Sequence, residues 1–125
     1  MAELISSPLD ASQIGLQGAV QPVPSNAKAF RVLLRIDAAD LHLEQRNGHW
    51  MGVLDVAIRL ESSKQKGVQL RTVSIDLPEE SFQTALLRGL SLDEAVTTDR
   101  PIDQVRIVVQ DRATGFAGSL LLPLS

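Results

Sequence analysis

The last part of the chain, residues 104–124, constrains the fold most strongly. It holds two runs in which every second residue is apolar, separated by a polar turn that ends in Gly115. This alternation is typical of β-strands with one buried face, and a glycine there supplies the positive φ that closes a hairpin. A four-residue loop from Asp111 to Thr114 gives three inward-facing pairs: Val109 with Phe116, Ile107 with Gly118, and Val105 with Leu120. We therefore predict that this hairpin is the central pair of strands in the fold.

The dipeptide Asn47-Gly48 predicts a second hairpin. It lies between two alternating segments, residues 41–46 and 49–61. Type I′ turns require positive φ at both central residues, which asparagine and glycine tolerate best. A two-residue loop pairs Gln45 with Trp50, and the register then places Trp50 on the inward face.

Four further alternating segments predict strands, at residues 14–21, 30–36, 68–77 and 90–96. In the 68–77 segment the apolar positions change parity between Leu70 and Val73. A parity change of this kind predicts a β-bulge, because one extra residue reverses the face to which the following side chains point.

Residues 78–88 carry the only helix signals in the chain. Pro78 suits a first turn, acidic residues follow it at the positive end of the helix dipole, and Gly89 provides a stop. We expect a short helix with an inward stripe formed by Phe82, Ala85 and Leu86.

Eight strands at near-regular spacing with one short helix predict an all-β domain. We expect an immunoglobulin-like or fibronectin-III-like β-sandwich of about seven or eight antiparallel strands. It would span residues 14–125, after an irregular lead-in over residues 1–13. Since the chain has 125 residues, such a domain can bury roughly two thirds of the surface of its unfolded chain.

Composition excludes several classes of partner. The net charge is −3, and the lysines and arginines form no basic run, so nucleic acid is not an expected partner. There is no cysteine, which removes disulfides and thiolate metal sites but leaves the compartment open. No apolar run approaches the roughly 18 residues that span a bilayer, and the first twelve residues lack the pattern of a signal peptide.

Three segments carry a resemblance to a known family: VLLRIDAADLHLEQRNGHWMGVLDVAIRL, SFQTALLRGLSL and VRIVVQDRATGFAGSLLLPL. Together, over residues 33–124, they resemble the C-terminal β-rich region of bacterial VWFA-related proteins, which are common in Acidobacteria. The resemblance implies an accessory sandwich that follows a von Willebrand factor A domain in an exported, extracytoplasmic protein. The metal-binding D-x-S-x-S pattern of that domain is not found in this sequence, so the resemblance carries over no metal site.

No catalytic constellation is visible in the sequence. A serine hydrolase needs a nucleophile, a base and an acid together, and there is no G-x-S-x-G elbow. His42 and His49 would lie roughly 13 Å apart at 3.3 Å per strand residue, too far to share one metal ion. We therefore predict no enzyme activity and no cofactor.

The acidic turns suggest calcium binding as one alternative. If successive strands alternate in direction, the turns that contain Asp37, Asp40, Asp99 and Asp103 lie at one end of the sandwich. Calcium binds clustered carboxylate oxygens of this kind, although the same residues also serve as turn and cap residues. The D-x-D-x-D-G spacing of a calcium loop is not found.

Carbohydrate binding and protein interaction are the remaining alternatives. A sugar platform needs an exposed aromatic face, whereas Trp50 is expected inside and the chain has no tyrosine. Open sandwiches keep free strand edges, and Leu33 and Val108 stand on otherwise polar faces. The sequence thus favours a structural or protein-interaction module that contacts other domains of its parent chain, another protein, or a second copy through a strand edge.

Overall fold

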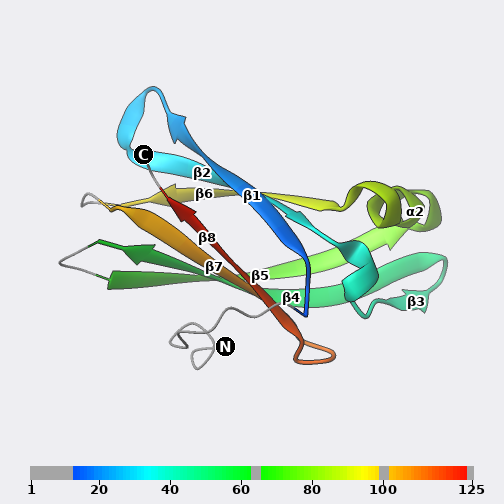
Figure 1. Ribbon diagram of the computed structural model, residues 1–125. Coiled ribbons are helices and arrows are strands. Elements are labelled where there is room, and N and C mark those ends of the chain that lie inside the picture. The colour runs from blue at the N-terminus through cyan, green and yellow to red at the C-terminus, as the bar shows by residue number, and fades with distance from the viewer. Residues whose placement is uncertain (1–12, 63–65, 99–101, 124–125) are drawn as a thin grey trace.

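The computed structural model of the chain describes residues 13–62, 66–98 and 102–123 (Figure 1). Its elements, in chain order, are β1 (Leu16–Val23), β2 (Asn26–Ile36), the 3-10 turn η1 (Ala38–Asp40), β3 (Glu44–Arg46), β4 (His49–Glu61), β5 (Lys66–Pro78), α2 (Glu79–Arg88), β6 (Leu90–Thr97), β7 (Gln104–Asp111) and β8 (Ala117–Pro123). The predicted all-β class is confirmed, and α2, the one α-helix among the described residues, confirms the predicted short helix.

The strands form two antiparallel sheets. One has the order β1-β2-β6 and is visibly curled, and the other has the order β5-β4-β7-β8 (Figure 1). The short strand β3 pairs with the first residues of β4, on the side that β7 occupies farther along. α2 and η1 lie together at one end of the two sheets.

The core lies between the two sheets and is built from alternate residues of the long strands. Burial of these side chains is the main favourable term in folding. They include Leu54, Val56 and Ile58 from β4, Val105, Ile107 and Val109 from β7, and Val32, Leu34, Ile36 and Val96 from the three-stranded sheet. β4 pairs with three strands, so β4 is the centre of the larger sheet.

The Asn47-Gly48 hairpin forms as predicted. Asn47 has φ 52° and Gly48 has φ 78°, and Gln45 pairs with Trp50. β3, however, is only three residues long, and Leu43 leaves the sheet to lie over Gly52. A Cβ on Gly52 would approach Leu43 Cδ2 to 2.5 Å, so the missing side chain makes room for Leu43.

The predicted register of the terminal hairpin is wrong by two residues. Val109 pairs with Gly118 and Ile107 with Leu120, whereas Phe116 lies beside the turn and is 46% exposed. Gly115 does have the expected positive φ, 76°.

The buried carboxylate of Asp111 explains the shift. It accepts hydrogen bonds from the backbone N–H groups of His42 at 2.7 Å and Ala113 at 3.0 Å. These bonds keep Asp111 at the end of β7, and the loop begins one residue later than expected. β7 lies between β4 and β8, whereas β8 pairs with β7 alone in its sheet, so only one strand of the terminal hairpin is central.

β5 contains no bulge, contrary to expectation. Its pairing with β4 runs without a register shift from His49 opposite Pro78 to Glu61 opposite Lys66. The apolar parity changes because β5 is an edge strand: Gln69 and Arg71 occupy inward positions, and Leu70 points outward, 68% exposed.

The helix is close to its predicted bounds. α2 follows Pro78, and Gly89 ends it with φ 85°. Ala85 is buried as expected and Phe82 packs against the core, but Leu86 is 37% exposed. Among the described residues no helix is both long and apolar enough to cross a membrane.

Candidate functional site

The acidic residues proposed for calcium do not all meet. In the β2–β6 register Ile36 lies opposite Leu90 and Ala29 opposite Thr97, so Asp37 and Thr97 lie at opposite ends of the sheet. Asp103 precedes β7, whereas His42, two residues after Asp40, contacts Asp111 at the other end of β7. Asp103 is thus far from Asp37 and Asp40, and Asp99 is outside the described residues. The simple alternation of strands fails because β3, with three residues, is too short to run the length of the sheet.

Asp37 and Asp40 have local structural roles. Asp37 caps η1 by accepting a hydrogen bond from Ala39 N at 3.1 Å, and Asp40 accepts one from Gly15 N at 2.8 Å. His49 contacts Asp76 at 2.7 Å between Nδ1 and Oδ1. Within residues 13–62, 66–98 and 102–123, no three acidic or histidine side chains are grouped so that they could hold a metal ion.

Trp50 fastens the helix to β4. Its ring stacks on Phe82 of α2 with centroids 4.2 Å apart and planes 19° apart. The indole N–H donates to Glu79, and this hydrogen bond, together with one from Gln83, lowers the pKa of the Glu79 carboxyl. One ring face is thus covered, which is not the arrangement of an open sugar-stacking platform.

Val108 is also unavailable as a docking residue. It points away from the core cluster, but it is 1% exposed. It lies opposite Ala57, in the row beside Arg59 and Arg106, which both reach Glu61 at 3.6 Å. The expectation of an accessible Val108 is therefore wrong.

An ion pair links the loop after β7 to β4. Arg112 donates two hydrogen bonds to Asp55, from Nη2 at 2.6 Å and from Nε at 3.2 Å. These hydrogen bonds hold the pKa of Asp55 below its ordinary value, against a smaller opposing effect of desolvation.

Replacing Asp55 by asparagine therefore changes the pH dependence of stability. Since the pKa is lower in the folded chain, the carboxylate stabilises the fold above its unfolded pKa, and this gain is lost as the pH falls through the folded value. The effect is small because the pair is partly exposed to solvent. In thermal melts we expect wild type to have a higher melting temperature than Asp55→Asn at neutral pH, and the two melting temperatures to converge in acid. A difference that persists in acid would contradict this.

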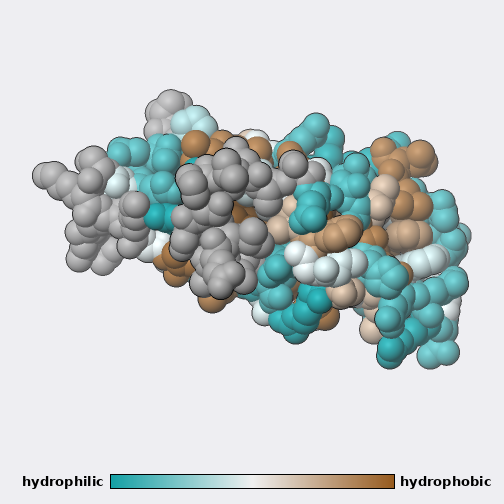
Figure 2. All heavy atoms as spheres, turned by 60° about the horizontal axis from the view of Figure 1, so that its bottom comes forward, coloured by the Kyte–Doolittle hydropathy of each residue, from teal (hydrophilic) through white to brown (hydrophobic). Residues whose placement is uncertain are grey.

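The outer face of the larger sheet carries a shallow hollow of about 500 Å³ near the β3–β4 hairpin. Met51 and Val53 contribute apolar surface, and charged side chains of both signs surround them: Glu44, Arg46, Asp76 and Arg112. Arg46 is paired with Glu44 and Arg112 with Asp55. Figure 2 looks toward this side, where hydrophilic and hydrophobic residues lie next to one another in the part that the structure describes. Because charges of both signs surround it, this hollow favours neither an anionic nor a cationic ligand.

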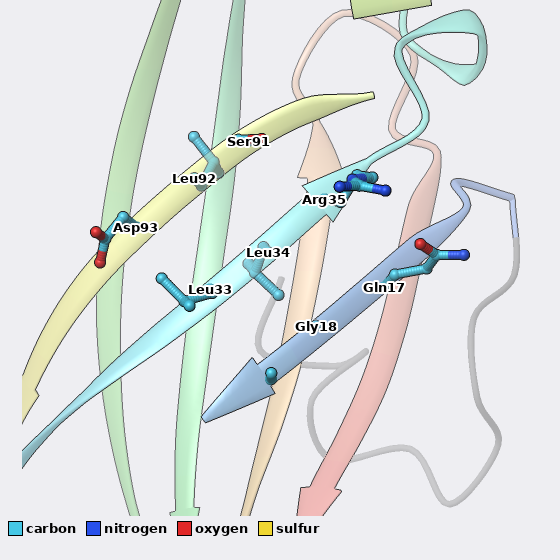
Figure 3. Close-up of a pocket in the computed structure, with 9 residues that line it drawn as sticks. Gln17, Gly18, Leu33, Leu34, Arg35, Ser91, Leu92 and Asp93 are labelled. Carbon is cyan, nitrogen blue, oxygen red and sulfur yellow. The ribbon is translucent and has the colours of Figure 1, made fainter. Parts of the chain in front are cut away.

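A second hollow, of about 550 Å³, lies on the outer face of the three-stranded sheet (Figure 3). Its floor is the backbone of Gly18, Leu34 and Leu92, which lie side by side on the three strands. Two cross-strand rows of outward side chains form its walls: Gln17, Arg35 and Ser91 in one, Ala19, Leu33 and Asp93 in the other. We call this hollow the sheet dish. The alternation within residues 30–36 predicts that Leu33 lies on an outer face, but it does not show which strands flank β2.

The free edge of β5 is the third surface. Arg112 N donates to Val53 O, so odd-numbered β4 residues direct their backbone groups toward β7. Even-numbered β4 residues therefore bond β5, and the register leaves the backbone groups of Val68, Leu70, Thr72, Ser74 and Asp76 on the open side. Among the described residues, no other strand hydrogen-bonds to this edge.

Side chains, rather than backbone ladders, bridge the gap between β5 and β6. Gln69 Nε2 donates to Thr97 O at 3.0 Å, and Arg71 lies 3.7 Å from Glu94. Within β5 itself, the guanidinium Nη1 of Arg71 donates to Leu70 O at 3.3 Å, so this one carbonyl of the open edge already accepts a hydrogen bond. The edges of the two sheets thus approach each other without joining into one continuous sheet.

No protein-family model, curated protein or solved structure matches this chain.

Proposed function

We propose that this chain is a non-catalytic protein-interaction module that accepts a β-strand from a partner along the edge of β5. The single observation that carries the proposal is this edge. It runs over 13 residues without a bulge, and Val68 and Leu70 on it are 49% and 68% exposed. A long, straight edge with apolar side chains is the surface that β-strand addition uses.

The strand order supports an immunoglobulin- or fibronectin-III-like module. With β3 set aside, one sheet holds the first, second and fifth strands, and the other holds the fourth, third, sixth and seventh. A constant-type immunoglobulin domain instead keeps its fourth strand beside its fifth. Pairing the fourth strand, β5, with the third gives the larger sheet its long free edge.

The wider setting follows from the family resemblance in the sequence. In this proposal the module belongs to a larger exported bacterial protein, in which it follows a von Willebrand factor A domain. Its partner strand comes from a second copy, because each copy carries the same edge, which no described strand pairs, and antiparallel pairing of two such edges is symmetric.

A proline at Thr72 tests the edge directly. The Thr72 N–H faces the open side, so Thr72→Pro removes an edge donor without breaking the β4–β5 ladder, as edge strands permit. We expect sedimentation velocity to show that wild type dimerises as its concentration rises. The dimer dissociation constant of Thr72→Pro should be at least about tenfold higher than that of Thr72→Ala, since a tenfold change corresponds to roughly one lost hydrogen bond.

Thr72→Ala is the matched control, because it keeps the backbone donor and changes only an exposed side chain. Wild type that stays monomeric at every concentration would contradict pairing between copies. So would a proline variant that associates as strongly as the alanine variant.

A further inference from the structure

We infer that the sheet dish binds an extended acidic segment of a partner protein, with a glutamate or aspartate side chain on Arg35 and an aliphatic side chain on Leu33. This site is separate from the β5 edge, because it is formed by β1, β2 and β6 on the other sheet.

The charge balance of the dish favours an anion. Arg35 is exposed and has no hydrogen-bond or ion-pair partner among the residues that the structure describes. The only acid of the dish, Asp93, is already engaged by Arg31, whose Nε donates to Asp93 Oδ1 at 3.0 Å. The dish therefore presents one unpaired cation and one neutralised carboxylate.

Arg35 is also held in place. A Cβ on Gly89 would lie 2.5 Å from Arg35 Cγ and 2.9 Å from Cδ, so the arginine stem packs where Gly89 has no side chain. A stem fixed in this way leaves less rotamer entropy to be lost on binding. Only the guanidinium remains to be engaged, and it matches a carboxylate with two parallel hydrogen bonds.

The neighbours of Arg35 suit the same ligand. Gln17 and Ser91 lie directly across from it on β1 and β6, and both side chains can donate hydrogen bonds to a carboxylate oxygen. Figure 3 shows Arg35 and Gln17 at one side of the dish and Leu33 and Asp93 farther along it.

The spacing of the dish selects an extended segment. Arg35 and Leu33 are two residues apart on one strand face, a separation of roughly 7 Å at 3.4 Å per residue. An extended peptide places residues i and i+2 on one side at the same spacing. The matching segment is therefore acidic–any–aliphatic, with the aliphatic side chain packed on Leu33 and Ala19.

Peptide titration followed by amide chemical shifts tests the site. The probe is Ac-Gly-Glu-Ser-Leu-Gly-NH2, whose blocked ends leave the glutamate as its only charge. We expect shifts at the amides of Gly18, Leu34 and Leu92, with affinity in the millimolar range typical of one charged and one aliphatic contact. Loss of the charge-assisted hydrogen bonds should weaken binding about tenfold or more for Arg35→Gln.

Arg35→Gln retains the aliphatic stem that packs on Gly89, so it should fold like wild type. Arg46→Gln is the matched control, since it removes an equal charge from an exposed arginine of the other sheet. A peptide with glutamine in place of glutamate should bind the wild-type protein as weakly as the glutamate peptide binds the Arg35→Gln protein. No shifts in the dish, equal binding of the glutamine peptide, or undiminished binding by Arg35→Gln would each overturn the inference; none of these results bears on the β5 edge.

Discussion

Replacing Gly118 by alanine is expected to destabilise the fold by about 3 kcal/mol, at the upper end of the range for overpacking. A Cβ at this position would lie 2.1 Å from the backbone oxygen of Ile14 and 3.0 Å from its carbonyl carbon. Both are backbone atoms, so no side-chain rotation can relieve the clash. The chain before β1 would have to move away from β8 and break the hydrogen bonds from Gln13 N and Ile14 N to Ala117 O, now 2.9 and 3.2 Å long.

The control for Gly118→Ala is Gly67→Ala on β5. A Cβ there meets nothing within 4 Å, and Gly67 does not have a positive φ. This variant should be neutral or gain roughly 0.4–1 kcal/mol through the unfolded chain. Urea denaturation measures both, and equal effects of the two substitutions would contradict the close approach of β8 to Ile14.

Replacing Ile58 by alanine should lower the free energy of unfolding by about 2–5 kcal/mol, the usual cost of truncating a fully buried isoleucine. Ile58 is 0% exposed and pairs across the sheet with Ile107, which is also 0% exposed. The cavity would open between the two sheets, where β4 is held by strands on both sides and cannot collapse easily.

Leu70→Ala serves as the comparison for Ile58→Ala. Leu70 is 68% exposed, so its truncation should change stability by no more than roughly 0.5 kcal/mol. Equal losses of stability in the two variants would contradict the burial of Ile58 on β4 and the exposure of Leu70 on β5.

Local rules predicted those parts of the fold that local chemistry determines. Asn47-Gly48 fixed its hairpin because a two-residue type I′ loop leaves one register, and Gly89 marked the end of the helix. The predicted register of the terminal hairpin is wrong because the buried contact between Asp111 and the backbone of His42 joins residues far apart in sequence. No pattern within residues 104–124 contains that information.

The predicted inward position of Leu70 is wrong for a different reason. Its apolar character predicts an inward position, and the parity change that follows predicts a bulge. The strand instead keeps its register and leaves Leu70 exposed, since an edge strand need not bury every apolar side chain. The sequence did indicate Leu33 and a strand edge as interaction features, but the row of Gln17, Arg35 and Ser91 depends on which strands flank β2.

Amide hydrogen exchange on β5, measured at low and high protein concentration, shows whether the β5 edge pairs with a second copy. At low concentration the amides of Leu70, Thr72 and Ser74 should exchange rapidly, because they face the open edge. The amides of Arg71 and Val73, which bond β4, should be protected at both concentrations. The edge amides should become protected as the protein concentration rises. Edge amides that are protected at every concentration, or at none, would contradict it.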